Sequence, residues 1–206
     1  MNTKSSASGD GLLQLFQLLN SIHPIGKGVE QYLLKTVSRC KISKGDYLLR
    51  SGQICNNFYF VNKGLLRGFI TEEKKEITTW FALENELVTA LNCFITRTAT
   101  LENIRAIEDC ELLVMSYDDL DKLYLKYPSF NIVGRKIAEL YYYLSENRGY
   151  IMRLHDAEKK YQLFLKSYSH IANRIKLIYI ASFLGITIET LSRVRAKASS
   201  LKKANH

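Results

Sequence analysis

Long apolar runs and clustered cysteines are both missing from this chain of 206 residues. No apolar run approaches the roughly 18–20 residues that span a bilayer, so we expect no membrane partner. Residues 1–20 lack a compact apolar segment behind a basic start, which predicts a cytoplasmic protein without a secretory signal. The four cysteines are far apart, with no CxxC spacing: Cys40, Cys55, Cys93 and Cys110. We expect them to be free, buried thiols rather than disulfides or metal ligands.

Histidine is absent from residues 24–154; the chain holds only His23, His155, His170 and His206. A metalloenzyme built on a β-roll of the cupin type needs clustered histidines and carboxylates from its strands, and this chain cannot supply them. No Ser-His-Asp or Cys-His arrangement is apparent, and Cys93 has no base near it in sequence. We therefore expect no catalytic residues, no metal and no cofactor, in a protein that is not an enzyme.

Acidic residues are scarce in the C-terminal quarter. Residues 150–206 hold 11 Lys and Arg but only three acidic residues, a formal charge of +8, whereas residues 1–149 carry +1. A nearly neutral body with a basic end indicates a module that binds a polyanion. A solvated basic helix face is the alternative. Membrane binding is a weaker one, because no Trp-rich apolar face opposes the charge.

The N-terminal part changes pattern near Cys40. Residues 12–39 have helical apolar spacing, and short apolar or alternating runs then follow up to Ser116. The runs predict strands at 46–50, 57–63, 65–71, 76–83, 87–91, 102–108 and 111–116. Gly45, Gly52 and Gly64 fall at breaks where positive φ or close backbone approach is expected. Many short strands at regular spacing are typical of an all-β sandwich or roll.

Helical patterns return after Ser116. Residues 118–128 predict a short helix ended by Pro128, and residues 129–148 predict a longer one. Its apolar stripe consists of Phe130, Val133, Ile137, Leu140, Tyr141 and Leu144. Such a stripe is either packed core or a dimer seam. The expected domains are a sensor domain at 1–126, a dimerisation helix at 127–148 and a helical domain at 149–206.

The segment 175–197 has the pattern of a helix-turn-helix. An apolar helix ends at Gly185, and Thr187 can cap a second helix, with Thr190 three residues later. Ala181 is small where two helices must approach, while Ile186 and Leu191 can fill the angle between them.

The second helix carries side chains that suit DNA. The candidate DNA-binding residues are Thr187, Glu189, Thr190, Ser192, Arg193, Arg195 and Lys197. Arg can pair with both acceptors of guanine, Glu accepts from cytosine N4, and Ser serves base edges or phosphate. Lys197, Lys202 and Lys203 are expected to follow the phosphate backbone.

The two motifs together resemble the Crp/Fnr family of bacterial transcription regulators. GDYLLRSGQICNNFYFVNKGLLRGF resembles the family's glycine-spaced strand motif, and IETLSR (188–193) its recognition-helix core. By that resemblance Glu189, Ser192 and Arg193 are base readers. The implied fold class is α+β: an N-terminal β-roll of the double-stranded β-helix (jelly-roll) type with flanking helices, a long dimerisation helix and a C-terminal helix-turn-helix domain.

The chain also departs from the family pattern. Members that bind cyclic AMP carry Gly-Glu and, about ten residues later, an Arg that holds the phosphate. Here those positions fall near Thr89-Ala90 and Thr100, and Arg97 is about three residues out of register. No cysteine precedes Cys40 for an iron–sulfur cluster. Because the roll has no histidine, axial haem ligation is disfavoured, and a C-terminal β-wing is not expected.

The expected function is that of a homodimeric, sequence-specific regulator that binds a pseudo-palindromic DNA operator. Its effector site is unknown: either a ligand other than a cyclic nucleotide binds in the roll, or nothing does. RNA polymerase is a further candidate partner. Two alternatives stay open. One is a small-ligand sensor whose helix-turn-helix is not its main output, and the other is a constitutive DNA-binding protein whose roll is only a scaffold.

Overall fold

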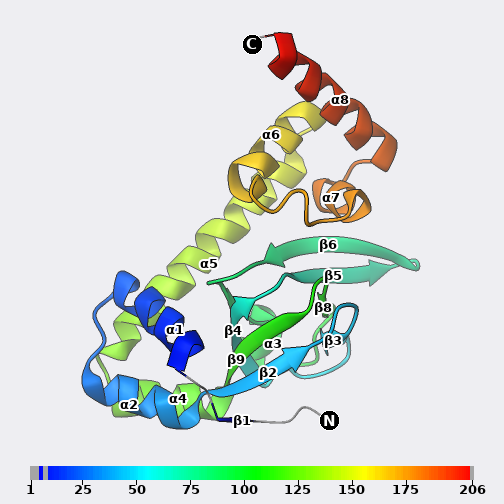
Figure 1. The fold of residues 1–206 in the computed structure, drawn as a ribbon. Coiled ribbons are helices and arrows are strands. Elements are labelled where there is room, and N and C mark those ends of the chain that lie inside the picture. The colour runs from blue at the N-terminus through cyan, green and yellow to red at the C-terminus, as the bar shows by residue number, and fades with distance from the viewer. Residues whose placement is uncertain (1–4, 7–8, 205–206) are drawn as a thin grey trace. The chain divides into compact units, whose positions relative to one another are not determined.

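The computed structural model describes residues 5–6 and 9–204 and confirms the α+β class (Figure 1). The strands are β1 (Ser5–Ser6), β2 (Ser38–Ile42), β3 (Tyr47–Leu49), β4 (Asn57–Lys63), β5 (Leu66–Glu72), β6 (Lys75–Ala82), β7 (Leu87–Val88), β8 (Glu102–Ala106) and β9 (Cys110–Ser116). The helices are α1 (Gly9–Ile22), α2 (Lys27–Thr36), α3 (Leu91–Thr96), α4 (Tyr117–Lys126), α5 (Phe130–Arg153), α6 (Ala157–Tyr168), α7 (Leu177–Leu184) and α8 (Ile188–Ala204).

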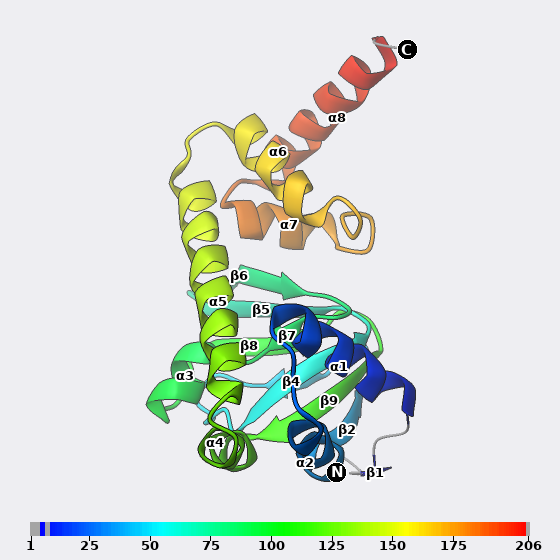
Figure 2. The ribbon, with the colours of Figure 1, turned by 90° about the vertical axis from the view of Figure 1, so that its left-hand side faces the viewer.

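Two antiparallel sheets build the roll. One has the strand order β1-β2-β9-β4-β7 and the other β3-β8-β5-β6 (Figure 2). β9 pairs with both β2 and β4, so that Leu112 lies opposite Cys40 on one side and opposite Val61 on the other. The crossovers place strands that are far apart in sequence next to one another, as in a roll with Greek-key connections.

The roll has an inner core and an outer core. Leu66, Ile104 and Leu112 are buried between the sheets together with all four cysteines, which are buried thiols as predicted. Outside the first sheet, α1, α2 and α4 bury their apolar faces against Phe60 and Leu113. β4 and β9 therefore have apolar side chains packed against both of their faces. Burial of this apolar surface stabilises the roll.

Two glycines in the roll allow other residues to lie close to their backbone. Gly45, Gly52 and Gly64 all have positive φ, as predicted. At Gly64 (φ 101°) a Cβ would lie 2.5 Å from the carbonyl oxygen of Asp109, so only glycine is accommodated. At Gly68 the indole of Trp80 covers the backbone, and its nitrogen donates a hydrogen bond to Glu102 at 2.8 Å.

Three local predictions were wrong. The helical region 12–39 is two helices, and its end is strand β2, which starts at Ser38. The run 87–91 is a strand only at Leu87–Val88, because the chain then enters α3. The C-terminal region is not helical throughout, since residues 169–176 between α6 and α7 are not helical.

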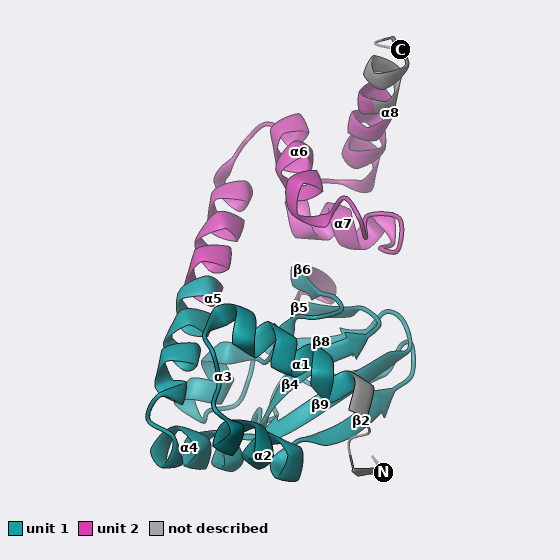
Figure 3. Cartoon of the chain, turned by 60° about the vertical axis from the view of Figure 1, so that its left-hand side comes forward, with its two compact units in different colours: residues 1–70, 80–140 teal, residues 71–79, 141–206 magenta. Residues whose placement is uncertain are grey.

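The chain divides into two compact units, residues 1–70 with 80–140 and residues 71–79 with 141–206 (Figure 3). Helix α5 belongs to both. α5 continues past Arg148 and Gly149 to Arg153, and the helical structure is interrupted at 154–156. A glycine inside a helix costs only about 1 kcal/mol, which a long helix tolerates.

The apolar stripe of α5 is divided between two environments. Phe130 and Val133 are buried in the outer core of the roll, whereas Leu140 and Leu144 are 50% and 42% exposed. The first half of the stripe is therefore core, whereas the two leucines of the second half keep about half of their surface exposed. In the described residues, no single helix is long and apolar enough to cross a membrane.

Candidate nucleic-acid interface

Helices α7 and α8 form a helix-turn-helix. α7 ends at Gly185, which has φ 61° and ψ 41°, and the amides of Gly185 and Ile186 donate to the carbonyls of Ser182 and Ala181. This is the hydrogen-bond pattern of a Schellman motif. The helix axes are bent by 101° at the turn. The angle falls within the range of roughly 90–120° that defines the motif.

Buried side chains hold the two helices at that angle. Ala181 is buried where α8 approaches, and Leu191 is completely buried. Phe183 of α7 packs against Phe164 of α6, with ring centroids 5.8 Å apart. Of the residues predicted to fill the angle, Ala181 and Leu191 therefore lie in the core of this unit, whereas Ile186 is half-buried.

The second helix begins with a side-chain cap. The hydroxyl of Thr187 accepts a hydrogen bond from the amide of Thr190 at 3.2 Å, as an N-cap residue does. The two threonine hydroxyls are also hydrogen-bonded, at 3.1 Å. Because this cap fixes the first turn of α8, the polar residues that follow have a defined starting geometry.

The candidate DNA-binding residues lie mostly on the exposed side of α8. Glu189, Ser192 and Arg193 are exposed near its N-terminal end, Lys197 is exposed further along, and Thr190 and Arg195 are half-buried. A guanidinium nitrogen of Arg193 lies 3.4 Å from the Thr190 hydroxyl. The side chains of Lys202 and Lys203, expected to follow the backbone, lie outside the described part of the helix.

Electrostatics favour a charged Glu189. Hydrogen bonds from its own backbone amide and from the Thr187 hydroxyl, together with the charge of Arg193, lower the pKa of its carboxyl group. The N-terminal end of a helix also favours a negative charge. Glu189 therefore stays an acceptor at neutral pH, as pairing with a cytosine amino group requires.

The second candidate region is the short helix α3 of the roll and its C-cap, Arg97, which has left-handed φ 58°. The Arg97 guanidinium donates to the carbonyl of Cys55 at 2.8 Å and to the side chain of Asn56. It also lies 4.2 Å from the centre of the Tyr117 ring. Arg97 thus ties the end of α3 to the neighbouring loop.

Comparison with known proteins gives matches on both halves of the chain. Residues 39–127 match the cyclic nucleotide-binding domain family. The transcriptional activator protein Anr of Pseudomonas protegens is 25% identical over 170 residues, which cover 74% of this chain and 67% of that protein. The anaerobic regulatory protein of Bacillus subtilis is 28% identical over 92 residues, 44% of this chain and 39% of that protein.

Comparison of the fold with solved structures also finds transcription regulators. The structure of FixK2 from Bradyrhizobium japonicum superposes with a TM-score of 0.70 at 15% identity, covering 81% of this chain and 86% of that one. Over most of its length the chain is similar to Crp/Fnr transcription regulators. Crp/Fnr regulators bind DNA and act as dimers. The match with the Bacillus regulator spans about two fifths of that protein's length.

The stretch of this chain that corresponds to the cyclic-nucleotide cassette lacks the charged side chains of the family pattern at its two anchor positions. Ala90 and Thr100 stand where the family pattern places the Glu and Arg anchors, and both are buried. Thr100 is held by backbone hydrogen bonds to Gln53 and Gly52, each 2.8 Å long. Since Arg97 is already bonded to the Cys55 loop, neither anchor position of the described cassette offers a free charge to a ribose or a phosphate.

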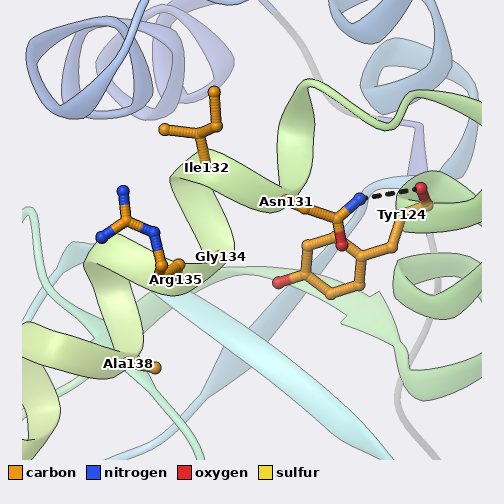
Figure 4. Close-up of a pocket in the computed structure, with 6 residues that line it drawn as sticks. All are labelled: Tyr124, Asn131, Ile132, Gly134, Arg135 and Ala138. Carbon is orange, nitrogen blue, oxygen red and sulfur yellow. Dashed lines mark hydrogen bonds between the residues drawn. The ribbon is translucent and has the colours of Figure 1, made fainter.

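A groove of about 550 Å³ lies elsewhere on the roll, between α4 and α5 (Figure 4). The ring of Tyr124 lies against Gly134, where a Cβ would be 2.5 Å from the Tyr124 hydroxyl. The amide of Asn131 donates to the Tyr124 carbonyl at 3.2 Å. Burial raises the pKa of Tyr124, so its hydroxyl remains a neutral group at the groove wall.

Sequence reasoning missed two residues that organise the helix-turn-helix. Lys160 and Glu158 of α6 contact α7 and α8, respectively. In the sequence, both residues contribute only to the charge balance of residues 150–206. A lysine four residues before Phe164, on the apolar face of α6, was the available signal.

Proposed function

We propose that this chain is a homodimeric, sequence-specific transcription regulator in which α8 enters the major groove of DNA. The observation that carries the proposal is the capped N-terminal turn of α8, from which Glu189, Ser192 and Arg193 project into solvent. These residue types recognise base edges. Thr187, Thr190, Arg195 and Lys197 would contribute phosphate contacts that set the register.

The proposed division of labour follows three segments. Residues 1–126 form the sensor domain, residues 127–148 the dimerisation helix and residues 149–206 the DNA-binding domain. The exposed half of the α5 stripe, with Leu140 and Leu144, supports pairing of two copies. Two recognition helices related by a two-fold axis would then bind half-sites roughly 34–36 Å apart on a pseudo-palindromic operator.

The roll of this cytoplasmic regulator is proposed to respond to a ligand other than a cyclic nucleotide, or to serve as a scaffold. The occupied Arg97 and the uncharged Ala90 and Thr100 support this choice. An effector that favours DNA binding must itself bind more tightly when DNA is present. RNA polymerase is the partner through which DNA binding would alter transcription.

Selection of bound fragments from a random DNA pool, without added effector, tests the proposal. The control is the Ser192→Ala/Arg193→Ala double variant, which keeps the Thr187 cap. Enrichment of a two-fold-symmetric site by the native protein alone supports a dimeric regulator that binds without ligand. Enrichment of the same site by both proteins contradicts the assignment of the base readers. If neither enriches a site, the sensor domain becomes the functional part to study.

A further inference from the structure

Lys160 is the one lysine in the described part of the chain that is buried, with 6% of its surface exposed. It lies on the inner side of α6, next to the buried Tyr161. Its ammonium nitrogen donates a hydrogen bond to the carbonyl oxygen of Leu184 at 2.9 Å. A buried lysine needs such a partner, because an unpaired charge in the interior is costly.

The Leu184 carbonyl is a group that the end of α7 leaves without a helical partner. The last four carbonyls of a helix have no intrahelical donor. In this Schellman turn the amides of Gly185 and Ile186 bond to the carbonyls of Ser182 and Ala181. Lys160 supplies a donor to the carbonyl of Leu184, the last residue of α7, at the negative end of the helix dipole.

The position of the Leu184 carbonyl connects Lys160 to the recognition helix α8. It belongs to the peptide that joins Leu184 to Gly185, the first peptide of the turn. The cap residue Thr187 follows after two further peptide bonds. A Cβ on Gly185 would lie 3.1 Å from Met152 and 3.8 Å from the Lys160 nitrogen, so the turn rests directly on these side chains.

Stability alone does not account for a cation here. A methionine has similar length, and replacing a buried charged group by an apolar one of similar volume is often neutral or stabilising. A hydrogen bond to one carbonyl adds a directional constraint that an apolar contact lacks.

We propose that Lys160 is a positioning residue for DNA recognition: its ammonium fixes the Leu184–Gly185 peptide and thereby the direction of α8. The inference rests on the proposed function, since it concerns how the base readers are presented. Lys160 itself contacts no DNA in this account. Its effect is transmitted through the turn to the first residues of α8.

The test uses Lys160→Met in the full-length protein, with Lys159→Met as the matched control. Lys159 is the exposed neighbour on the same helix, so its replacement removes the same charge without touching the turn. Affinity for the selected operator and for random DNA is measured by fluorescence anisotropy, and stability by urea unfolding. Lys160→Arg, which keeps a charged donor, tests rescue.

Lys160→Met is expected to lose about tenfold or more in operator affinity relative to Lys159→Met, with random-DNA affinity equal in the two variants. Lys160→Arg should stay within about threefold of the native protein, because hydrogen bonds to charged donors are retained. Operator affinity equal in the two Met variants overturns the proposal. So does a tenfold loss in Lys160→Arg, which also decides the matter if Lys160→Met does not fold.

Hydrogen exchange separates this inference from the proposed function. The amides of Ile186 and Thr190 are hydrogen-bonded within the turn and cap. They are expected to exchange faster in Lys160→Met than in Lys159→Met, whether or not an operator has been found. Unchanged exchange at both amides overturns the positioning role. Failure of the native protein to select any DNA contradicts the proposed function instead.

Discussion

The ammonium of Lys197 lies 2.6 Å from a carboxylate oxygen of Glu158, which joins α8 to α6 by an ion pair. The hydrogen bond to Glu158 raises the pKa of Lys197. Both side chains are substantially exposed, and exposed pairs of this kind contribute only about 0–1 kcal/mol. A DNA phosphate can therefore compete with Glu158 for this lysine.

Glu158→Gln should increase DNA affinity for all sequences. Loss of the carboxylate releases Lys197 for a phosphate, so the dependence of log affinity on log salt should steepen by up to about one unit. Titrations at several salt concentrations measure the slope. Glu146→Gln, at an exposed position of α5, makes the same charge change away from the Glu158–Lys197 pair. Equal slopes in the two variants would show that Glu158 does not restrain Lys197.

Arg193→Ala is expected to cost about 1–3 kcal/mol on the operator and to relax base preference at one position. Its guanidinium is exposed at the N-terminal half of α8 and makes a long contact, 3.4 Å, to the Thr190 hydroxyl. Lys197→Ala should instead weaken binding to all sequences alike, since it removes a phosphate contact. Binding to operator and random DNA gives both values. Similar losses on the two DNAs for Arg193→Ala would rule out its role in base recognition.

Leu140→Asp should convert the dimer to monomers. A charge in the middle of an apolar seam is expected to raise the dissociation constant by about thirtyfold or more. Sedimentation velocity over a range of concentrations measures this. Leu101→Asp is the control, because Leu101 is 81% exposed on the roll, outside the α5 stripe. A dimer that survives in Leu140→Asp places the seam elsewhere.

Gly64→Ala should destabilise the roll more than Gly52→Ala. Both glycines have positive φ, which costs an alanine about 1–2 kcal/mol. At Gly64 the new Cβ would also lie 2.5 Å from the Asp109 carbonyl and 2.6 Å from the Cys110 sulfur, whereas at Gly52 nothing lies within 4 Å. Urea unfolding is expected to show an extra loss of about 2 kcal/mol at Gly64. Equal losses would mean that the backbone at Asp109 and Cys110, where β9 begins, moves away from the new Cβ.

Alkaline pH should weaken the fold. Burial raises the pKa of Cys110 from 9.0 to about 11 and that of Tyr59 from 10.0 to about 12. The folded state therefore keeps protons that the unfolded chain releases, so the free energy of unfolding falls as pH rises from about 9 to about 12. Urea titrations at successive pH values measure it. A Cys110→Ala/Tyr59→Phe variant should show a shallower decline; an equal decline would assign the effect to other groups.

The strands with regular alternation were predictable because their burial follows their sequence. β4 and β5 lie within two residues of their predicted limits. β2 was missed because only Cys40 of its five residues is buried, so almost no alternation marks it. Helix α3 has six residues, too few for a helical period to show.

The helix-turn-helix could be located because its signals are local. Gly185, Thr187 and Leu191 each act within a few residues of their position. The contacts of Lys160 with Leu184 and of Glu158 with Lys197 span 24 and 39 residues, so no local pattern marks them. The stripe on α5 shows the same limit: periodicity predicts an apolar face but not which partner covers each half.

The indole of Trp80, stacked over Gly68 and bonded to Glu102, is the chain's single tryptophan. Its fluorescence therefore comes from one site in the roll, and no other indole contributes to the emission. Any small molecule that displaces Trp80 from Glu102 changes the polarity around the fluorophore and shifts its spectrum. Occupancy of the roll and binding of labelled DNA can thus be followed at two wavelengths in the same sample.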